Sequence, residues 1–339
     1  MDVNAFTHLF CSRIQDTEAL VEATNKSSVL VIQQFPVPTD GTTLVPHVRE
    51  SISNVLAFVE LGDVPILRSC LNLADGVFDI IIMDADLKLP QSAELISLTR
   101  ATVGRSQLFY FCDNSVWAGA GIGIIQVIER DLFGKQVLLT GNGILTTHLS
   151  LGLIQAGATV YRPDDASPRM LLTNRAAFSE VETIERIHEG FNYSNIDLVV
   201  GGAVKEQTID RELCERVRNG IRLYDIGIGN LSEEAVLLAR EKGCDVYRLD
   251  NRAGISAMVL GQMEADYLVK NVMGKVNIKS VEIVAGGIMG RSGAIIVDNI
   301  RDPGYVIGVA NGRGRIKHRP ETDDEQKDLD FVQRLITKW

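Results

Sequence analysis

The sequence predicts an α/β protein, in which an N-terminal α/β domain is followed by a second α/β domain and by extra C-terminal β-strands. Three observations indicate this fold class. Short apolar runs rich in β-branched residues alternate with helical patterns, which is typical of parallel sheets with right-handed crossovers. A glycine-rich turn follows one of these runs and opens a helix in the middle of the chain. Beyond residue 280, further apolar runs are separated by glycine-rich turns instead of helices.

Size and composition limit the possible functions. The chain has 339 residues, of which 45% are hydrophobic, enough for more than one core. Its net charge of −10 argues against sequence-independent nucleic-acid binding, which needs a basic surface. The five cysteines have no C-x-x-C spacing, which argues against a disulfide framework or a zinc site. Because no apolar run reaches the ~18 residues of a membrane span and no signal pattern begins the chain, we expect a soluble, cytoplasmic protein without a membrane partner.

The first part of the chain predicts a parallel sheet with flanking helices. Apolar residues recur at helical spacing from Val3 to Thr24, and a second helix is expected from Val45 to Val55, with Pro46 tolerated in its first turn. Short apolar runs predict buried strands. These strands are Ser28–Gln33, Ala57–Leu61, Phe78–Met83 and Leu108–Cys112.

A helix from Ala118 to Leu132 is expected to link this sheet to a second series of strands and helices. The helix after the glycine turn should end at Gly157, because glycine readily adopts the left-handed conformation that ends many helices. The strands of the second series share the short apolar pattern. They are Gln136–Thr140, Thr159–Arg162, Ile196–Val200, Arg222–Ile226 and Asp245–Leu249.

The C-terminal part predicts added strands or hairpins and a final helix over Thr322–Trp339, capped by Thr322. The strands are Val281–Ala285, Gly293–Val297 and Tyr305–Val309. We therefore expect three domains, over residues 1–116, 117–274 and 275–339. Because isolated hairpins are marginal in water, the apolar strands must extend another sheet or pair with a second subunit, and we expect a homodimer.

The strongest functional signal is the glycine turn between the strand Gln136–Thr140 and the helix that follows it. The turn consists of Gly141, Asn142, Gly143, Ile144, Leu145 and Thr146. In this G-x-G-x-x-T pattern the first glycine permits the tight turn, and the second lets a pyrophosphate approach the backbone. The helix N-terminus supplies free N–H groups and a partial positive charge. The pattern predicts a Rossmann-type domain that binds a dinucleotide.

The choice of dinucleotide depends on Asp164, which follows the next strand of the series. A carboxylate there can accept hydrogen bonds from the ribose hydroxyls and repels a 2′-phosphate, so we expect NAD rather than NADP. Arg162 leaves NADP open, since an arginine can accommodate the phosphate. Gly201 and Gly227 end later strands, where small residues would let the backbone approach the ribose and nicotinamide; ordinary strand-to-helix turns are the alternative.

Candidate catalytic residues follow two strands of the first sheet: Asp84, Asp86, Lys88, Asp113 and Asn114. The aspartates could hold a substrate ammonium group, and Lys88 could act as a general acid or base. We expect Asp113 and Asn114 at the junction with the second domain, where a substrate must meet the nicotinamide. A solvated turn for the first group and helix capping for the second are the alternatives.

Arg252 is a further candidate, for substrate binding. It opens a loop that is expected to face the same cleft, and its planar fork suits a substrate carboxylate; a surface arginine is the alternative. The five histidines have no metal-ligand spacing, so no metal is expected.

Several segments resemble the amino-acid-dehydrogenase-like two-domain family, which includes shikimate dehydrogenase. Gly134–Asp164 is similar to that family's second domain, and Met258–Gln262 to one of its late segments. The resemblance implies that Gln262 faces the substrate cleft. Other segments resemble the pyrroline-forming dehydrogenase of pyrrolysine biosynthesis: Ile80–Asp86, Gly121–Ile125 and Gly254–Met258. These resemblances imply a class, a biosynthetic two-domain dehydrogenase.

The main hypothesis is therefore an NAD(P)-dependent dehydrogenase that transfers a hydride between the nicotinamide and a small amino-acid or hydroxy-acid substrate bound between two domains. One alternative is a lyase or hydrolase that uses tightly bound NAD as a transient oxidant. The other is a non-catalytic NAD-binding protein.

Overall fold

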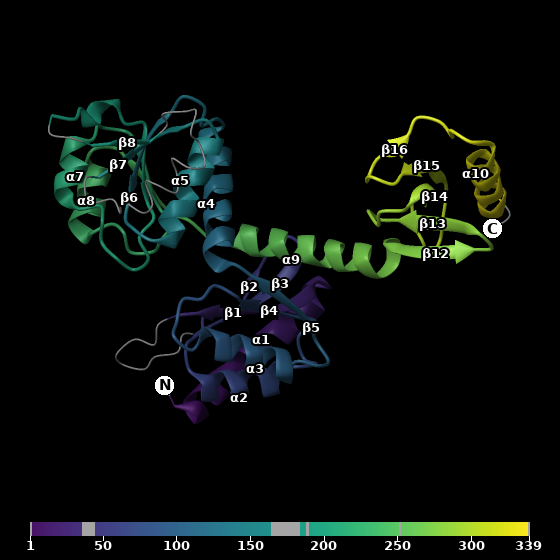
Figure 1. Cartoon of the computed structure of the whole chain (residues 1–339). Helices are drawn as coiled ribbons and strands as arrows, with labels where there is room; N and C mark the ends of the chain where they lie inside the picture. Colours follow the sequence, from purple (N-terminus) through teal and green to yellow (C-terminus); the bar gives the residue numbers. More distant parts are fainter. Residues whose placement is uncertain (1, 36–44, 164–183, 188–189, 251, 338–339) are drawn as a thin grey trace. The chain divides into compact units, whose positions relative to one another are not determined.

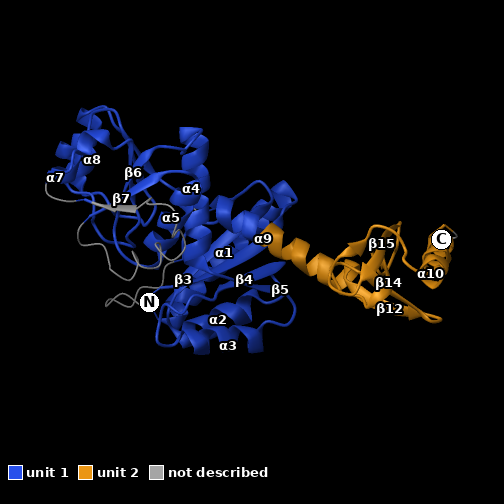
Figure 2. Cartoon of the chain, turned by 45° about the horizontal axis from the view of Figure 1, so that its top comes forward, with its two compact units in different colours: residues 1–258 blue, residues 259–339 orange. Residues whose placement is uncertain are grey.

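A computed structural model describes residues 2–35, 45–163, 184–187, 190–250 and 252–337 of the chain (Figure 1). The chain divides into two compact units, residues 1–258 and 259–339, called here the first and second units (Figure 2). The division falls inside the helix α9 (Arg252–Tyr267). The first unit contains two sheets and the second unit contains one.

The first sheet has the strand order β2-β3-β1-β4-β5. Its strands are β1 (Ser27–Gln34), β2 (Arg49–Glu50), β3 (Asn54–Leu61), β4 (Ile80–Asp84) and β5 (Gln107–Phe111). All pairs are parallel except β2 with β3. The central strands are buried along almost their whole length, which explains why they read as continuous apolar runs. The predicted helix Val3–Thr24 is confirmed as α1, and the sheet's other helices are α2 (Val64–Ala74) and α3 (Ser92–Thr102).

The expected helix over Val45–Val55 is wrong. This segment instead contains β2 and the start of β3. A tight turn joins the two strands, in which the N–H of Ser51 donates to the carbonyl of Asn54 and the N–H of Asn54 donates to the Ser51 hydroxyl. Serine and asparagine favour such turns, and Val55 gains a buried place beside β1, so pairing in the sheet outweighs the local helical pattern.

The second sheet is a Rossmann-type, doubly wound sheet in which all described pairs are parallel. Its order is β11-β10-β9-β6-β7-β8, so the strand order reverses at β6 (Gln136–Thr140). Its other strands are β7 (Thr159–Arg162), β8 (Ile184–Arg186), β9 (Leu198–Gly201), β10 (Arg222–Asp225) and β11 (Asp245–Arg248). The glycine turn follows β6, at the point where such sheets bind ligands.

The helices of the second sheet are α4 (Asp113–Glu129), α5 (Ile144–Gln155), α7 (Arg211–Arg216) and α8 (Glu233–Glu241). The linking helix α4 begins five residues earlier than the sequence suggested, so Asp113 and Asn114 are its first residues. Gly157 follows α5 with φ of 88°, which confirms the predicted left-handed helix end.

The second unit is a sheet of strands in sequential order, packed against the C-terminal helix. The strands are β12 (Gly274–Ile278), β13 (Val281–Ala285), β14 (Ser292–Val297), β15 (Val306–Asn311) and β16 (Ile316–Lys317). Between β13 and β14 the pairing is parallel, and the other pairs are antiparallel. The final helix α10 (Asp323–Ile336) starts as predicted, with the Thr322 side chain accepting from the N–H of Glu325.

The apolar strands of the second unit are covered within that unit. Val281, Ile283, Ile295 and Val297 are buried in one cluster with Val332 of α10. The sequence-based expectation of a homodimer rested on an exposed apolar patch at these strands, which α10 covers, and the homodimer itself stays a prediction. The described helices include none with the length and sustained apolar character of a membrane-spanning segment.

We expect Val332→Ala to lower the free energy of unfolding of the second unit by about 2 kcal/mol, because it removes two buried methyl groups and leaves a cavity. Hydrogen exchange of the β13 and β14 amides measures this loss. Lys327→Ala, on the exposed side of the same helix, is the control and should change exchange little. Equal protection in the Val332→Ala variant and the unmodified protein would contradict the role assigned to α10.

Candidate functional site

Three residues that the sequence singled out form one cluster. The Nζ atom of Lys88 lies 2.7 Å from Oδ2 of Asp84 and 2.6 Å from Oδ2 of Asp113. Asp84 ends β4, and Asp113 opens α4 directly after β5. Because β4 and β5 are parallel neighbours, their carboxyl ends lie at the same edge of the sheet and bring these residues together. Both carboxylates are almost completely buried, and the lysine side chain is 16% exposed.

Asp86 and Asn114 lie beside this cluster, and their hydrogen bonds join the turn after β4 to the start of α4. Oδ2 of Asp86 accepts hydrogen bonds of 2.9 Å from both the backbone N–H and the side-chain amide of Asn114. The N–H of Asp86 in turn donates to Oδ1 of Asp84, which forms a local turn. The structure therefore gives both residues positioning contacts, as the turn and helix-start alternatives expected. Contact of either residue with a substrate stays a prediction.

Two glutamines that the sequence analysis missed orient the carboxylates. Nε2 of Gln33 donates to Oδ1 of Asp113 at 2.7 Å. The backbone N–H of Gln34 donates to Oδ2 of Asp84 at 3.2 Å, and its Nε2 donates to the backbone carbonyl of Asp84 at 2.7 Å. Both glutamines end β1, which lies beside β4 in the sheet. The sequence did contain a sign of their role, because these two polar residues end a strand whose central residues are apolar. What the sequence alone could not show is that β1 and β4 are neighbours.

The cluster has unusual proton affinities. Burial raises the pKa of Asp84 to about 6; repulsion from Asp113 acts in the same direction, and the Lys88 ammonium opposes it. Burial works against the charged form of Lys88, but the two carboxylates outweigh it and raise the pKa of the lysine above its usual value. Lys88 is therefore a cation at neutral pH and suits hydrogen-bond donation better than the role of a general base.

Glu60, at the end of β3, is a second residue that the sequence analysis missed. Its Oε2 atom lies 3.6 Å from Nζ of Lys205, which follows β9 of the second sheet. Burial raises the pKa of the Glu60 carboxyl, although Lys205 opposes the shift. Nζ of Lys205 also lies 4.0 Å from the centre of the Phe35 ring, and Nζ of Lys88 lies 5.8 Å from the same ring. The ammonium groups of Lys205 and Lys88 thus both lie near the Phe35 ring, and Lys205 is also ion-paired with Glu60.

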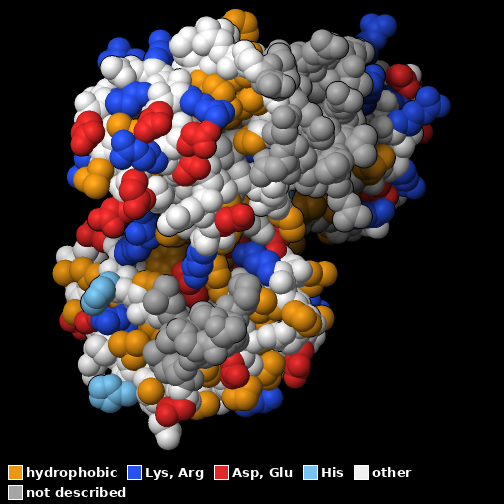
Figure 3. All heavy atoms as spheres, turned by 90° about the vertical axis from the view of Figure 1, so that its left-hand side faces the viewer, with side chains coloured by type: hydrophobic (Ala, Val, Ile, Leu, Met, Phe, Trp, Pro, Cys, Tyr) orange, Lys and Arg blue, Asp and Glu red, His pale blue; other side chains and the backbone are white. Residues whose placement is uncertain are grey.

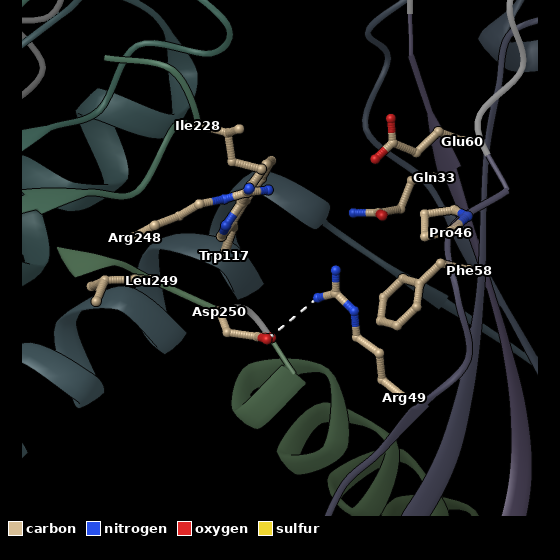
Figure 4. Close-up of a pocket in the computed structure, with 10 residues that line it drawn as sticks. All are labelled: Gln33, Pro46, Arg49, Phe58, Glu60, Trp117, Ile228, Arg248, Leu249 and Asp250. Carbon is tan, nitrogen blue, oxygen red and sulfur yellow. Dashed lines mark hydrogen bonds and ion pairs between the residues drawn. The ribbon is translucent and has the colours of Figure 1, made fainter. Parts of the chain in front are cut away.

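A cavity of about 330 Å³ opens next to these residues (Figure 4). Its walls come from both sheets of the first unit, the loops that follow their strands, and helix α4. The lining residues are Gln33, Pro46, Arg49, Phe58, Glu60, Trp117, Ile228, Arg248, Leu249 and Asp250. Gln33 joins the cavity to the Asp113 carboxylate, so the buried cluster and the cavity form one candidate site. Mixed apolar walls with a few polar groups are typical of small-molecule sites.

Figure 3 shows one face of the molecule, on which basic and acidic groups lie side by side with no extended area of one sign among the described residues. Among the described residues, no group of three His, Cys, Asp or Glu side chains is arranged to hold a metal ion.

The glycine turn has left-handed backbone conformations at both of its glycines. Gly141 has φ of 90°, and a Cβ atom there would lie 2.5 Å from the backbone nitrogen of Ala203, so the position requires glycine. At Gly143, with φ of 121°, a Cβ would meet no atom of the described residues within 4 Å. Gly143 also precedes α5 without a side-chain cap, which leaves the helix N–H groups open to an anion.

The other residues of the turn divide into exposed and buried positions. Asn142 and Ile144 are exposed, whereas Leu145 lies in the core. Thr146, at the third glycine position of the pattern, is completely buried, and its hydroxyl donates to the carbonyl of Gly202 at 3.0 Å. Threonine thus permits the close contact between helix and sheet that glycine gives in other such turns.

Gly201 and Gly227 are explained by packing inside the protein. A Cβ at Gly201 would lie 2.5 Å from Cβ of Asn230, and one at Gly227 would collide with the carbonyl of Ala203. Asn230 is completely buried and bonds both the N–H and the carbonyl of Ala203. Cofactor contact at the two glycines stays a prediction.

Arg162 is completely buried behind the glycine turn. Its guanidinium donates to the carbonyl of Leu139 at 2.5 Å and to the carbonyl of Gly141. Asp164, the predicted ribose ligand, lies outside the described residues.

The two substrate-binding candidates from the sequence lie outside the cavity lining. Arg252 donates through Nε to Oδ2 of Asp250 at 2.8 Å and through a terminal nitrogen to the carbonyl of Glu50. Arg252 therefore contacts Asp250, which lines the cavity, without lining the cavity itself. Gln262 belongs to the second unit, so its place in a cleft stays a prediction.

No family model and no curated protein matches the sequence. Solved structures resemble the fold. Hetero-hexameric glutamate dehydrogenase from Thermus thermophilus has 16% identity and a TM-score of 0.44, over 71% of this chain and 68% of that chain. L-tryptophan dehydrogenase from Nostoc punctiforme has 12% identity and a TM-score of 0.40, over 70% and 74%. Aspartate transcarbamoylase from Trypanosoma cruzi has 11% identity and a TM-score of 0.38, over 71% and 88%. These likenesses concern the arrangement of helices and strands, not the reaction.

The raised pKa of Asp84 predicts a pH-dependent stability. The carboxyl titrates near 6 in the folded chain, against a usual value of 3.8, so the folded state holds this proton more tightly. Its contribution is fully present below the usual value and is lost as pH rises through 6, which amounts to about 3 kcal/mol at 1.36 kcal/mol per pKa unit. Urea unfolding between pH 4 and 7 should show this fall relative to the Asp84→Asn variant, which cannot titrate. Glu18→Gln, at an exposed carboxylate, is the control. Parallel stability curves for the unmodified protein and Asp84→Asn would contradict the assignment.

Proposed function

We propose that the protein is an NAD-dependent dehydrogenase that transfers a hydride between the nicotinamide and the reacting carbon of a small amino-acid or hydroxy-acid substrate. The observation that carries the proposal is the position of the Asp84–Lys88–Asp113 cluster. It lies at the carboxyl edge of the first sheet, beside a cavity whose other wall comes from the carboxyl edge of the second sheet, and the second sheet carries the glycine turn. Such an edge is where α/β sheets bind ligands.

The glycine turn supports the choice of cofactor class. The open space at Gly143 and the uncapped start of α5 suit a pyrophosphate, and the bound dinucleotide would supply the hydride donor or acceptor. The buried position of Arg162 supports NAD over NADP, because its guanidinium donates to backbone carbonyls instead of facing a 2′-phosphate. In this proposal the Asp164 carboxylate accepts hydrogen bonds from the ribose hydroxyls, as the sequence suggests.

The first sheet would supply orientation and proton transfer. Lys88, kept charged by its two carboxylates, would donate a hydrogen bond to the oxygen or bind the carboxylate at the reacting carbon. Hydride transfer at a carbon that bears a hydroxyl or amino group also requires a proton to move. Glu60 lines the cavity and has a raised pKa, so it is the proposed proton acceptor and donor. Gln33 would keep the Asp113 carboxylate directed at Lys88.

Lys88→Met and Asp113→Asn should each lower kcat by about 10²–10⁴-fold, the usual contribution of a positioned polar group, and leave the Kd of NAD unchanged. NAD reduction with a panel of amino and hydroxy acids measures turnover, and calorimetry measures NAD binding. Lys26→Met is the matched control, since Lys26 is also ion-paired and partly buried but precedes β1 at the opposite edge of the sheet. Unchanged turnover in folded variants would remove the cluster from the site. Tight NAD binding without net NADH formation would favour a transient-oxidant lyase or hydrolase, or a non-catalytic NAD-binding protein.

NAD should bind the unmodified protein at least ~10-fold more tightly than NADP, because a carboxylate at the ribose repels the 2′-phosphate. Isothermal titration of both dinucleotides tests this directly. Equal or tighter binding of NADP would show that Asp164 does not have the proposed role.

A further inference from the structure

Two arginines that neither the sequence analysis nor the proposed mechanism uses line the cavity. Arg49 belongs to β2 of the first sheet, and Arg248 ends β11 of the second sheet. Figure 4 shows both guanidinium groups reaching into the space between the sheets. Gln33 and Glu60 lie on the wall opposite Arg248. Arg248 therefore lies across the cavity from the acid–base groups, whereas Arg49 shares the first-sheet side with Gln33 and Glu60.

Arg49 is held in place by two contacts. A terminal nitrogen lies 3.3 Å from Oδ2 of Asp250, and the guanidinium carbon lies 5.7 Å from the centre of the Phe58 ring. Oδ2 of Asp250 is also 2.8 Å from Nε of Arg252, so one carboxylate is shared by two arginines. Arg49 is therefore oriented by its surroundings, while its charge is only partly compensated.

The side chain of Arg248 is exposed and has no hydrogen-bond or ion-pair partner among the residues that the structure describes. The carboxylate of Glu60, on the opposite wall, is already paired with Lys205. The described lining itself carries two positive groups, Arg49 and Arg248, and two negative groups, Glu60 and Asp250. Both carboxylates are also paired with cations outside the lining, Lys205 and Arg252. Arg248 is therefore the lining cation whose charge is available to a ligand, and a carboxylate would compensate it.

Building on the proposed function, we propose that the substrate is a dicarboxylic 2-oxo, 2-hydroxy or 2-amino acid. Arg248, assisted by Arg49, receives the carboxylate at the far end of the substrate, because a guanidinium fork matches the two oxygens of a carboxylate. The apolar side chains of Trp117 and Ile228 contact the intervening carbons. The reacting carbon lies at the Gln33 and Glu60 side. The volume of about 330 Å³ limits the substrate to a short chain.

The test compares acids of equal chain length in the full-length protein with saturating NAD⁺, a combination in which a 2-oxo acid is not turned over. The probes are 2-oxoglutarate against 2-oxopentanoate, and 2-oxoadipate against 2-oxohexanoate, titrated by calorimetry. In each pair a terminal carboxylate replaces a methyl group. We expect at least one dicarboxylate to bind 10-fold or more tightly than its partner.

Variants of Arg248 test whether this residue causes the preference for the dicarboxylate. Arg248→Met should bring the two acids of the pair to within about 3-fold of each other, and Arg248→Lys, which keeps the charge but loses the fork, should retain only part of the preference. Arg240→Met, at an exposed arginine in the last turn of α8, is the matched control and should keep the full preference. A second variant at Arg248 keeps the test decisive if one of them does not fold.

Equal affinity within both pairs, no binding of any dicarboxylate, or a full preference in a folded Arg248→Met variant would each overturn the inference. Separate measurements of NAD binding and of NADH-dependent turnover keep the two proposals apart. Turnover of monocarboxylic acids with no role for Arg248 would leave the proposed function standing and refute the substrate class. An Arg248-dependent preference without NAD binding would refute the proposed function instead.

Discussion

Two buried carboxylates, Asp84 and Asp113, share the single ammonium group of Lys88, and the candidate site depends on this arrangement. A buried charge is costly unless it is paired and hydrogen-bonded, and removing one partner of a buried pair costs about 3–5 kcal/mol. The chain meets this constraint with groups from each neighbouring element: Gln33 and Gln34 from β1, and the turn at Asp86 after β4. These contacts fix where β4, β5 and α4 end or begin. The charged and polar groups at the carboxyl edge of the first sheet are therefore arranged around the Lys88 ammonium group.

Much of the architecture could be predicted because strands buried on both faces read as apolar runs, and polar residues after them mark the carboxyl edge. Asp84, Lys88 and Asp113 were found in this way. Gln33 and Glu60 were not, because one sequence does not reveal that β1 lies between β3 and β4. One further expectation failed, because the segment before β3 pairs with β3 as a hairpin instead of forming a helix. The homodimer stays a prediction, although α10 covers the apolar strands that suggested it.

The glycines show how one residue type can have two unrelated causes. Gly201 and Gly227 lie at strand ends where a ligand was expected, yet the buried Asn230 side chain and the Ala203 backbone occupy the space that a side chain would need. Gly143 differs, because no atom in the described part of the chain lies near the position of its absent Cβ. Only the second kind of glycine leaves room for something outside the chain. Sequence spacing cannot separate the two, since both follow a strand and precede a helix or loop.

The buried Arg162 has a consequence for redesigning the cofactor preference. Engineers commonly reverse such a preference by removing the acidic residue after the second strand and using a nearby arginine to hold the added phosphate. In this chain the nearby arginine already binds the carbonyls of Leu139 and Gly141. Recruiting it would withdraw one donor from the end of β6 and one from the glycine turn. A designer would have to import a new cation from a different loop and leave Arg162 untouched.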